Sequence, residues 1–122
     1  MNEMRIFSIV IDCSDSPTLS TFYAKLLGWT KHDEQSEHIS VSKEGVYPFL
    51  LFQQIDDYKP PVWPENPHDQ RQMIHLDFVV TDIREAIGHA ESCGAVKAPV
   101  QYSDRWTVLF DPQGHPFCLC QR

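Results

Sequence analysis

Two similar halves make up this sequence, and the repeat limits the possible folds more than any other feature. Residues 6–29 and 73–95 each run from an apolar segment through an aspartate into a helix pattern that stops at a glycine. Residues 45–53 and 114–121 also match, since both contain glycine, a Pro-Phe pair and the ending x-Leu-x-Gln. Two copies of about 50 residues are too few and too large for a solenoid. We therefore expect a pseudo-symmetric domain of two modules.

Each module contains one predicted helix. Asp15 or Ser16 can cap the first helix and Asp82 the second, because a side-chain oxygen there can accept a backbone N–H. We expect the two helices to end at Gly28 and Gly94, since glycine favours the conformation that terminates a helix. Both helices carry an apolar stripe, which favours packing on a sheet over a groove for a partner.

The remaining apolar runs predict strands. They are residues 4–12, a weaker strand near 29–33, and 37–42, 48–54, 73–80, 98–102, 106–110 and 116–121. The result is two βαβββ modules, at about 4–55 and 73–121, joined by a proline-rich linker at 56–72. We expect one α+β domain over 1–122, in which a curved mixed sheet has its helices on the outer face and leaves a cleft on the other.

Composition restricts the partners. The net charge of -7 argues against nucleic acid and anionic membranes, both of which need clustered Lys and Arg. No segment approaches the roughly 18 apolar residues of a membrane span, and the N-terminus lacks a signal-peptide pattern. We expect a cytoplasmic protein. The four cysteines show no zinc-finger spacing and are interpreted as reduced thiols.

Three segments resemble the vicinal oxygen chelate superfamily, which includes glyoxalase I, bleomycin-resistance proteins and extradiol dioxygenases. They are residues 75–82 (HLDFVVTD), residues 111–120 (DPQGHPFCLC) and residues 22–29 (FYAKLLGW). The first two most resemble the glyoxalase-like domain subgroup. The resemblance covers nearly the whole chain and implies the glyoxalase/bleomycin resistance-like fold, with a pocket in the cup of the sheet.

In metal-using members, the resemblance implies a divalent ion held by the first and last strands of each module. Those positions fall on Ser8, Leu50, His75 and Cys118. Leu50 cannot bind a metal and Ser8 is a poor ligand, so His75 is the one position that keeps a usual ligand. We predict a degenerate metal site, no required cofactor and no glyoxalase I activity, while a divalent metal remains an alternative.

His75 and Asp77 share one face of a predicted strand. They form either a catalytic acid/base pair or a hydrogen-bonded polar pair in the wall of the cup. Trp63 and Trp106 either line the pocket or pack in the core. The expected ligand-binding residues are Ser8, Leu50, Phe52, Trp63, His75, Asp77, Trp106 and Cys118.

Three functions remain open at this point. The first is a homodimeric protein that binds a small aromatic or hydrophobic molecule in the sheet cup, like the bleomycin-resistance members. The second is a lyase, isomerase or dioxygenase-type enzyme that uses His75 with a divalent metal, or His75 and Asp77 in acid/base chemistry. The third is a structural dimer without a ligand. A fold by itself does not decide among them.

Overall fold

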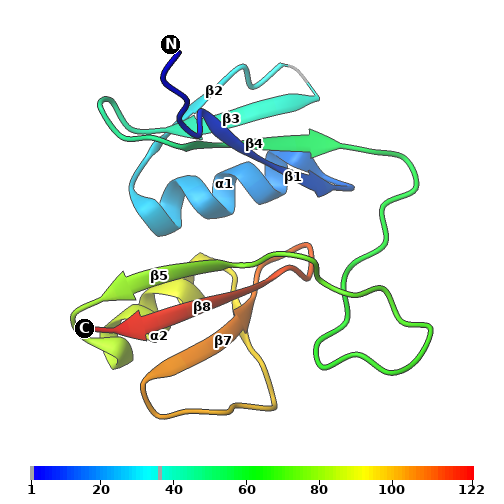
Figure 1. The fold of residues 1–122 in the computed structure, drawn as a ribbon, viewed down its shortest axis with the longest axis vertical. Helices are drawn as coiled ribbons and strands as arrows, with labels where there is room; N and C mark the ends of the chain where they lie inside the picture. Colours follow the sequence, from blue (N-terminus) through cyan, green and yellow to red (C-terminus); the bar gives the residue numbers. More distant parts are fainter. Residues whose placement is uncertain (1, 36) are drawn as a thin grey trace. The chain divides into compact units, whose positions relative to one another are not determined.

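The computed structural model describes residues 2–35 and 37–122 (Figure 1). Over this part of the chain it contains two helices and eight strands. They are β1 (Ser8–Cys13), α1 (Ser16–Leu27), β2 (Thr30–His32), β3 (His38–Ser42), β4 (Phe49–Gln54), β5 (Leu76–Val80), α2 (Ile83–Cys93), β6 (Val96–Lys97), β7 (Trp106–Phe110) and β8 (Pro116–Gln121). The chain divides into two compact units, the first ending at Tyr58 and the second beginning at Lys59.

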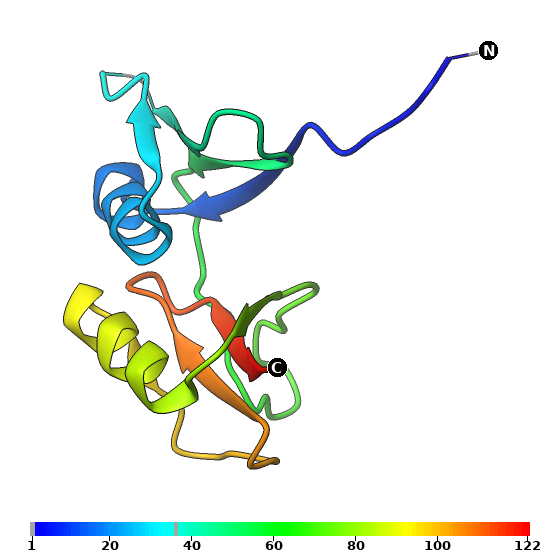
Figure 2. The ribbon, with the colours of Figure 1, turned by 90° about the vertical axis from the view of Figure 1, so that its left-hand side faces the viewer.

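Both units have the same topology. The strand order is β1-β4-β3-β2 in the first sheet and β5-β8-β7-β6 in the second. In each sheet the first and last strands of the module pair in parallel, and the other pairs are antiparallel. Each sheet has one helix against one face (Figure 2). The predicted α+β fold of two βαβββ modules is confirmed, with the strands forming two four-stranded mixed sheets.

Side-chain caps start both helices. The backbone N–H of Thr18 donates to Asp15 Oδ1 at 3.0 Å, and that of Glu85 donates to Asp82 Oδ1 at 3.1 Å. Asp15, rather than Ser16, therefore caps α1. The helices end at Gly28 and at Gly94, both in the left-handed conformation that glycine adopts readily. No helix in the described residues is both long and apolar enough to cross a membrane.

A glutamine from the last strand also binds each helix start. Gln54 Oε1 accepts the N–H of Ser16, and Gln121 Oε1 accepts the N–H of Ile83, each at 3.0 Å. Gln54 is thus the counterpart of Gln121, whereas the sequence repeat had matched Gln53 to it. The structural repeat is therefore offset by one residue from the repeat seen in the sequence. In a strand, an offset of one residue moves each side chain to the opposite face of the sheet.

This register places Leu50 and Phe52 against α1. Phe52 is fully buried and stacks on Tyr23 of α1, with ring centroids 5.4 Å apart. Leu50 lies two residues away on the same face and is also buried. The expectation that these two side chains line a ligand pocket is therefore wrong, because the helix covers their face. The opposite, open face of this sheet carries Leu51 and its partner Val10.

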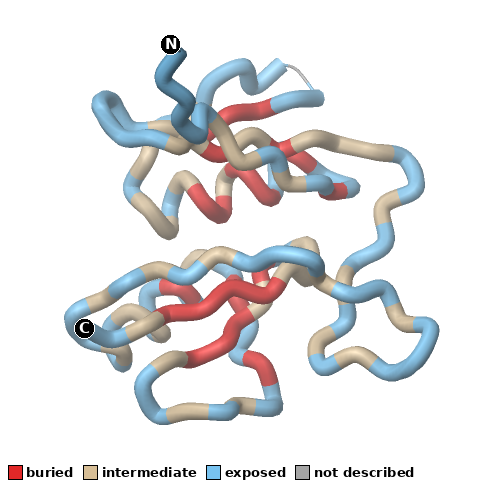
Figure 3. The backbone as a smooth tube through the Cα atoms, in the orientation of Figure 1, coloured by how far each residue is buried: buried red, intermediate tan, exposed pale blue. Residues whose placement is uncertain are grey.

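The second unit has its core between α2 and the middle strands β7 and β8 (Figure 3). Leu109 and Phe117 pair across these strands and are fully buried. Ala90 is the buried residue of α2. Thr107 and Leu119 continue the same face of the sheet. The other face of the sheet is left free of the helix.

The predicted strand 98–102 is absent, and β6 comprises Val96–Lys97 instead. The N–H of Ala98 still donates to the carbonyl of Val108 at 3.0 Å, and beyond that bond the side chain of Gln101 takes the place of strand pairing. Its Nε2 donates to the carbonyl oxygens of Ala98 and Val108, and its Oε1 accepts the N–H of Val108, at 2.8 to 2.9 Å. Because one side chain satisfies these backbone groups, the segment can turn away from the sheet.

Candidate functional site

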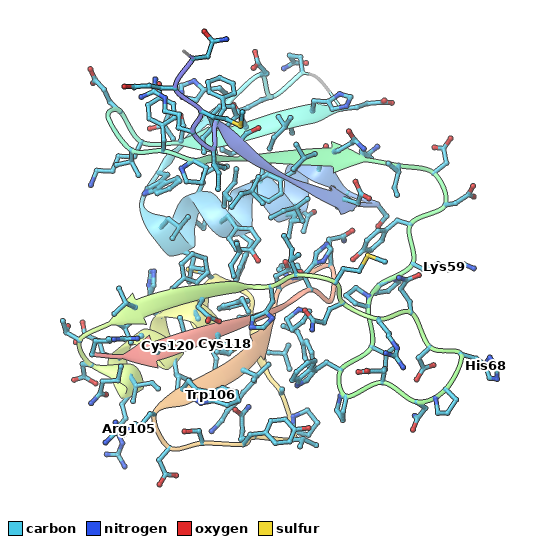
Figure 4. The ribbon with its side chains drawn as sticks, viewed as in Figure 1. Lys59, His68, Arg105, Trp106, Cys118 and Cys120 are labelled. Atoms are coloured by element: carbon cyan, nitrogen blue, oxygen red, sulfur yellow. The ribbon has the colours of Figure 1, made fainter. Side chains whose placement is uncertain are left out.

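The open face of the second sheet carries the chemically active side chains. Asp77 pairs with Cys118 across β5 and β8, and Trp106 pairs with Cys120 across β7 and β8. These residues alternate with Phe117 and Leu119, which face α2. Figure 4 shows Cys118 and Cys120 along β8 and Trp106 at the start of β7. His75 lies immediately before β5, which begins at Leu76, and not within the strand as predicted.

The side chains of His75, Asp77 and Cys118 meet on this face, and we call them the polar cluster. His75 Nε2 lies 3.2 Å from Asp77 Oδ1, which confirms that the two residues are neighbours. Together with the Cys118 sulfur, one donor atom from each residue lies within 4.8 Å of the other two. The side chains of His75 and Asp77 are 35% and 61% exposed, whereas Cys118 is 5% exposed. Cys118 is therefore the buried end of the cluster, and His75 and Asp77 face the solvent.

Gln72 orients the imidazole of His75. His75 Nδ1 lies 3.2 Å from Gln72 Oε1, and this contact is a hydrogen bond in the tautomer that carries its hydrogen on Nδ1. In that neutral tautomer the Nε2 lone pair is directed at the Asp77 carboxylate. Two facing lone pairs repel unless a cation lies between them, either a proton or a metal ion.

Cys118 is a protonated thiol at neutral pH in this arrangement. Burial is the largest cause, and the charge of Asp77 and a hydrogen bond to Asp77 add to it, so that the pKa of Cys118 rises from 9.0 to about 12. Burial and Asp77 also raise the pKa of Cys120, against an opposing effect of Arg122. Cys118 is therefore not an activated nucleophile.

Aromatic rings border the polar cluster. The rings of Tyr102 and Trp106 stack with centroids 6.2 Å apart, and Trp63 meets Tyr102 edge to face, also at 6.2 Å. The Trp63 ring lies 6.4 Å from that of His75. We call Trp63, Tyr102 and Trp106 the aromatic row. Trp63 and Trp106 also pack against the buried cluster of Ala98, Val108 and Cys118.

Trp63 reaches this face because its segment docks on the second unit. The N–H of Val62 donates to the carbonyl of Gln70 at 2.8 Å, which closes the segment into a loop. At Gly114, a Cβ would lie 3.0 Å from the Cβ of Pro60, and the φ of 87° also favours glycine. Residues 59–72 of the predicted linker thus belong to the second compact unit.

Comparison with known proteins gives the family. The sequence model of the glyoxalase-like domain matches residues 8–120. The chain belongs to the glyoxalase-like domain family. This places the glyoxalase-like chain in the vicinal oxygen chelate superfamily, as its motifs had indicated.

One curated relative and two solved structures illustrate the similarity. The glyoxalase-like chain is 27% identical to YaeR of Escherichia coli (strain K12), over 97% of this chain and 96% of YaeR. It resembles TnmS3, an antibiotic binding protein from Streptomyces sp. CB03234, with 16% identity, a TM-score of 0.66 and coverage of 99% and 98%. A glyoxalase/bleomycin resistance protein/dioxygenase family enzyme from Burkholderia phytofirmans PsJN gives 14% identity, a TM-score of 0.67 and coverage of 93% and 95%. At these identities the solved structures show the fold.

The donor set decides which metal this glyoxalase-like chain fits. Mg²⁺ prefers oxygen ligands in octahedral geometry, and Asp77 is the one oxygen donor in the cluster. Imidazole, carboxylate and thiolate are all zinc ligands. The cluster therefore fits a zinc-type ion, with His75, Asp77 and Cys118 as the residues that would hold it.

The predicted site residues separate into two groups. Trp63, His75, Asp77, Trp106 and Cys118 gather on the open face of the second sheet. Ser8 begins β1 in the first unit, and Leu50 and Phe52 face α1 there. Tyr102 was not among the predicted site residues, because it falls in the predicted strand 98–102, which is absent. Its position four residues before Trp106, in a segment bounded by polar residues, was the available signal.

A shallow groove of about 380 Å³ lies elsewhere in the second unit. It is lined by residues of β5, the following turn and α2, namely Val79, Val80, Thr81, Asp82, Glu85, Ala86 and His89. None of the aromatic row or the polar cluster lines it. The chemistry-bearing residues, rather than this groove, mark the candidate site.

Proposed function

We propose that this protein binds a small aromatic or hydrophobic molecule on the open face of the second sheet. The aromatic row beside the polar cluster carries the proposal. Offset or edge-to-face contact with aromatic rings favours a flat ligand. A few polar groups among apolar ones are the usual composition of a small-molecule site, where they set the orientation of the ligand.

The exposure of the row supports binding. Tyr102 is 56% exposed, and Trp63 and Trp106 are half-buried, so all three rings offer surface to a ligand.

Trp63 also has an unsatisfied hydrogen-bond donor. Its Nε1 is buried without a hydrogen-bond partner among the described residues, and leaving such a donor unpaired costs about 1–3 kcal/mol. The structural likeness to an antibiotic binding protein is consistent with the proposal and concerns that protein's own ligand.

Tryptophan fluorescence of the purified protein tests the proposal. A Trp29→Phe background leaves Trp63 and Trp106 as the reporters, and a panel of flat aromatic compounds is titrated. For a compound that binds, Tyr102→Ala should weaken affinity about 2- to 10-fold, the effect of one aromatic contact. Tyr47→Ala is the matched control, since Tyr47 is an exposed tyrosine of the first unit. Equal losses in both variants, or no binding by any compound, would refute the proposed site.

A divalent-ion site is the second candidate, and the meeting of His75, Asp77 and Cys118 favours it. A bound ion would supply Lewis-acid polarisation of a ligand oxygen, as in a lyase, isomerase or dioxygenase-type enzyme. Without an ion, the His75–Asp77 pair at 3.2 Å offers acid/base chemistry. Elemental analysis of untagged wild-type protein and His75→Ala tests the ion: bound metal that is lost in the variant supports it.

We also propose that the chain acts as a single-domain homodimer in the cytoplasm. β1 and β5 each end the strand order of their sheet, and an edge strand can pair with another chain. Light scattering at micromolar concentration should give a mass near twice 14.1 kDa. A mass of one chain at all concentrations would contradict the dimer.

A further inference from the structure

The polar cluster combines one donor of each kind that zinc accepts. Its members come from neighbouring strands, since Asp77 on β5 pairs directly with Cys118 on β8. β8 lies between β5 and β7, so the sulfur is held by a strand that is paired on both sides. A ligand on such a strand keeps its position better than one on a loop.

The orientation of His75 gives a second and independent indication. Metal-binding histidines commonly donate the hydrogen of their other ring nitrogen to an oxygen, which fixes the tautomer. In the tautomer with its hydrogen on Nδ1, His75 donates to Gln72 Oε1 at 3.2 Å, and Nε2 is left to point at the Asp77 carboxylate 3.2 Å away. The space between Nε2 and the carboxylate is therefore suited to a cation.

The distances require little movement. Ligand atoms around a tetrahedral zinc lie about 3.5 Å apart, given zinc-ligand bonds of about 2.0–2.3 Å. The pair His75 Nε2 and Asp77 Oδ1 already meets this distance, and the Cys118 sulfur lies within 4.8 Å of both. Rotation of the two exposed side chains can close the remaining gap of about 1 Å.

We propose that His75, Asp77 and Cys118 form a site for thiophilic divalent ions such as zinc, and that Cys118 is the ligand that selects the ion. This rests on the second candidate function and adds the class of ion to it. Binding breaks the S–H bond of Cys118 and passes its proton to solvent, so that the thiolate becomes the third protein ligand. Three protein ligands leave a fourth position for water or for an oxygen of a bound molecule.

Cobalt(II) substitution tests the proposal without any activity assay. The chelator-treated protein should take up one equivalent of Co²⁺ with a thiolate-to-cobalt charge-transfer band, and Zn²⁺ should displace it. Cys118→Ser should abolish the band and weaken Zn²⁺ binding at least about 100-fold. Cys120→Ser is the matched control, since Cys120 lies two residues away on the same strand and face, and it should leave the band unchanged. Asp77→Asn, at an exposed position, should weaken binding about 10- to 100-fold and covers the case in which Cys118→Ser fails to fold.

Each result that contradicts the proposal rules out a different part of it. Co²⁺ binding without a charge-transfer band, or equal binding of Zn²⁺ by Cys118→Ser and wild type, would overturn the role of Cys118 while leaving the divalent-ion site. Displacement of Zn²⁺ by Mg²⁺ at equal concentration would overturn the ion class. Failure to bind any of the three ions would overturn the site itself, whereas the titration with aromatic compounds would be unaffected.

Discussion

In the metal-free protein, the Cys118 thiol should react with iodoacetamide far more slowly than an ordinary cysteine, because the thiolate is the attacking form. Burial, the charge of Asp77 and the hydrogen bond to Asp77 raise the pKa of Cys118 from 9.0 to about 12. A rise of about three pH units lowers the thiolate fraction near pH 8 about a thousandfold. Asp77→Asn removes the charge, replaces the carboxylate acceptor by a neutral amide oxygen and leaves burial, so it should restore part of the reactivity.

Peptide mass spectrometry after timed labelling measures the rate at each cysteine. In the urea-unfolded chain the rate at Cys118 should level off above about pH 9, whereas in the native protein it should still rise near pH 11. The shape of the pH profile separates the two possible causes, since restricted access lowers the rate without moving the midpoint. Circular dichroism over the same pH range confirms that the protein stays folded.

A native profile that levels off near pH 9 would refute the reasoning, because it would mean that the sheet does not desolvate Cys118. The sign of the linked stability effect follows from the same shift. Since the pKa of Cys118 in the folded state is raised above its value of 9.0, the associated stabilisation is fully present below about pH 9 and is lost as pH rises toward 12. The urea midpoint should therefore fall over this range, and fall less in Cys118→Ala.

Three further predictions concern the fold and are read by urea denaturation. Phe52→Ala should cost about 3–5 kcal/mol because α1 covers Phe52, and Leu51→Ala on the open face should cost clearly less; the reverse order would show that the register is wrong. Gln101→Ala should cost about 1–3 kcal/mol, since three hydrogen bonds to backbone groups are lost, and an unchanged midpoint would contradict their role. Gly114→Ala should cost about 1–3 kcal/mol through its positive φ and its contact with Pro60, with faster proteolysis within 59–72; unchanged cleavage would mean that this segment is not docked.

Local chemistry made the helices predictable. Asp15 and Asp82 bind N–H groups three residues ahead, and Gly28 and Gly94 end the helices through their own backbone conformation. Such interactions join residues within one helix turn, so the amino-acid sequence alone is enough to predict them. The βαβββ order followed, because each helix separates runs of apolar residues.

The faces of β4 were not predictable from the repeat. The shared Pro-Phe pairs suggested that Leu50 corresponds to Cys118, but the contacts of Gln54 and Gln121 show that Leu51 does. An apolar run such as that of β4 has no polar alternation to indicate which face is buried. The choice was made by α1, which packs on Phe52.

The sequence by itself determined the two modules, the family and the neighbourhood of His75 and Asp77, since residues two apart in or beside a strand share a face. Tertiary structure alone decided the third member and the surroundings of the site. Cys118 is 41 residues from Asp77 and meets it through parallel pairing of β5 with β8. Trp63 and Tyr102 arrive on loops whose paths depend on Gly114 and Gln101. These contacts join segments far apart in the chain, and their geometry depends on packing that no local pattern records.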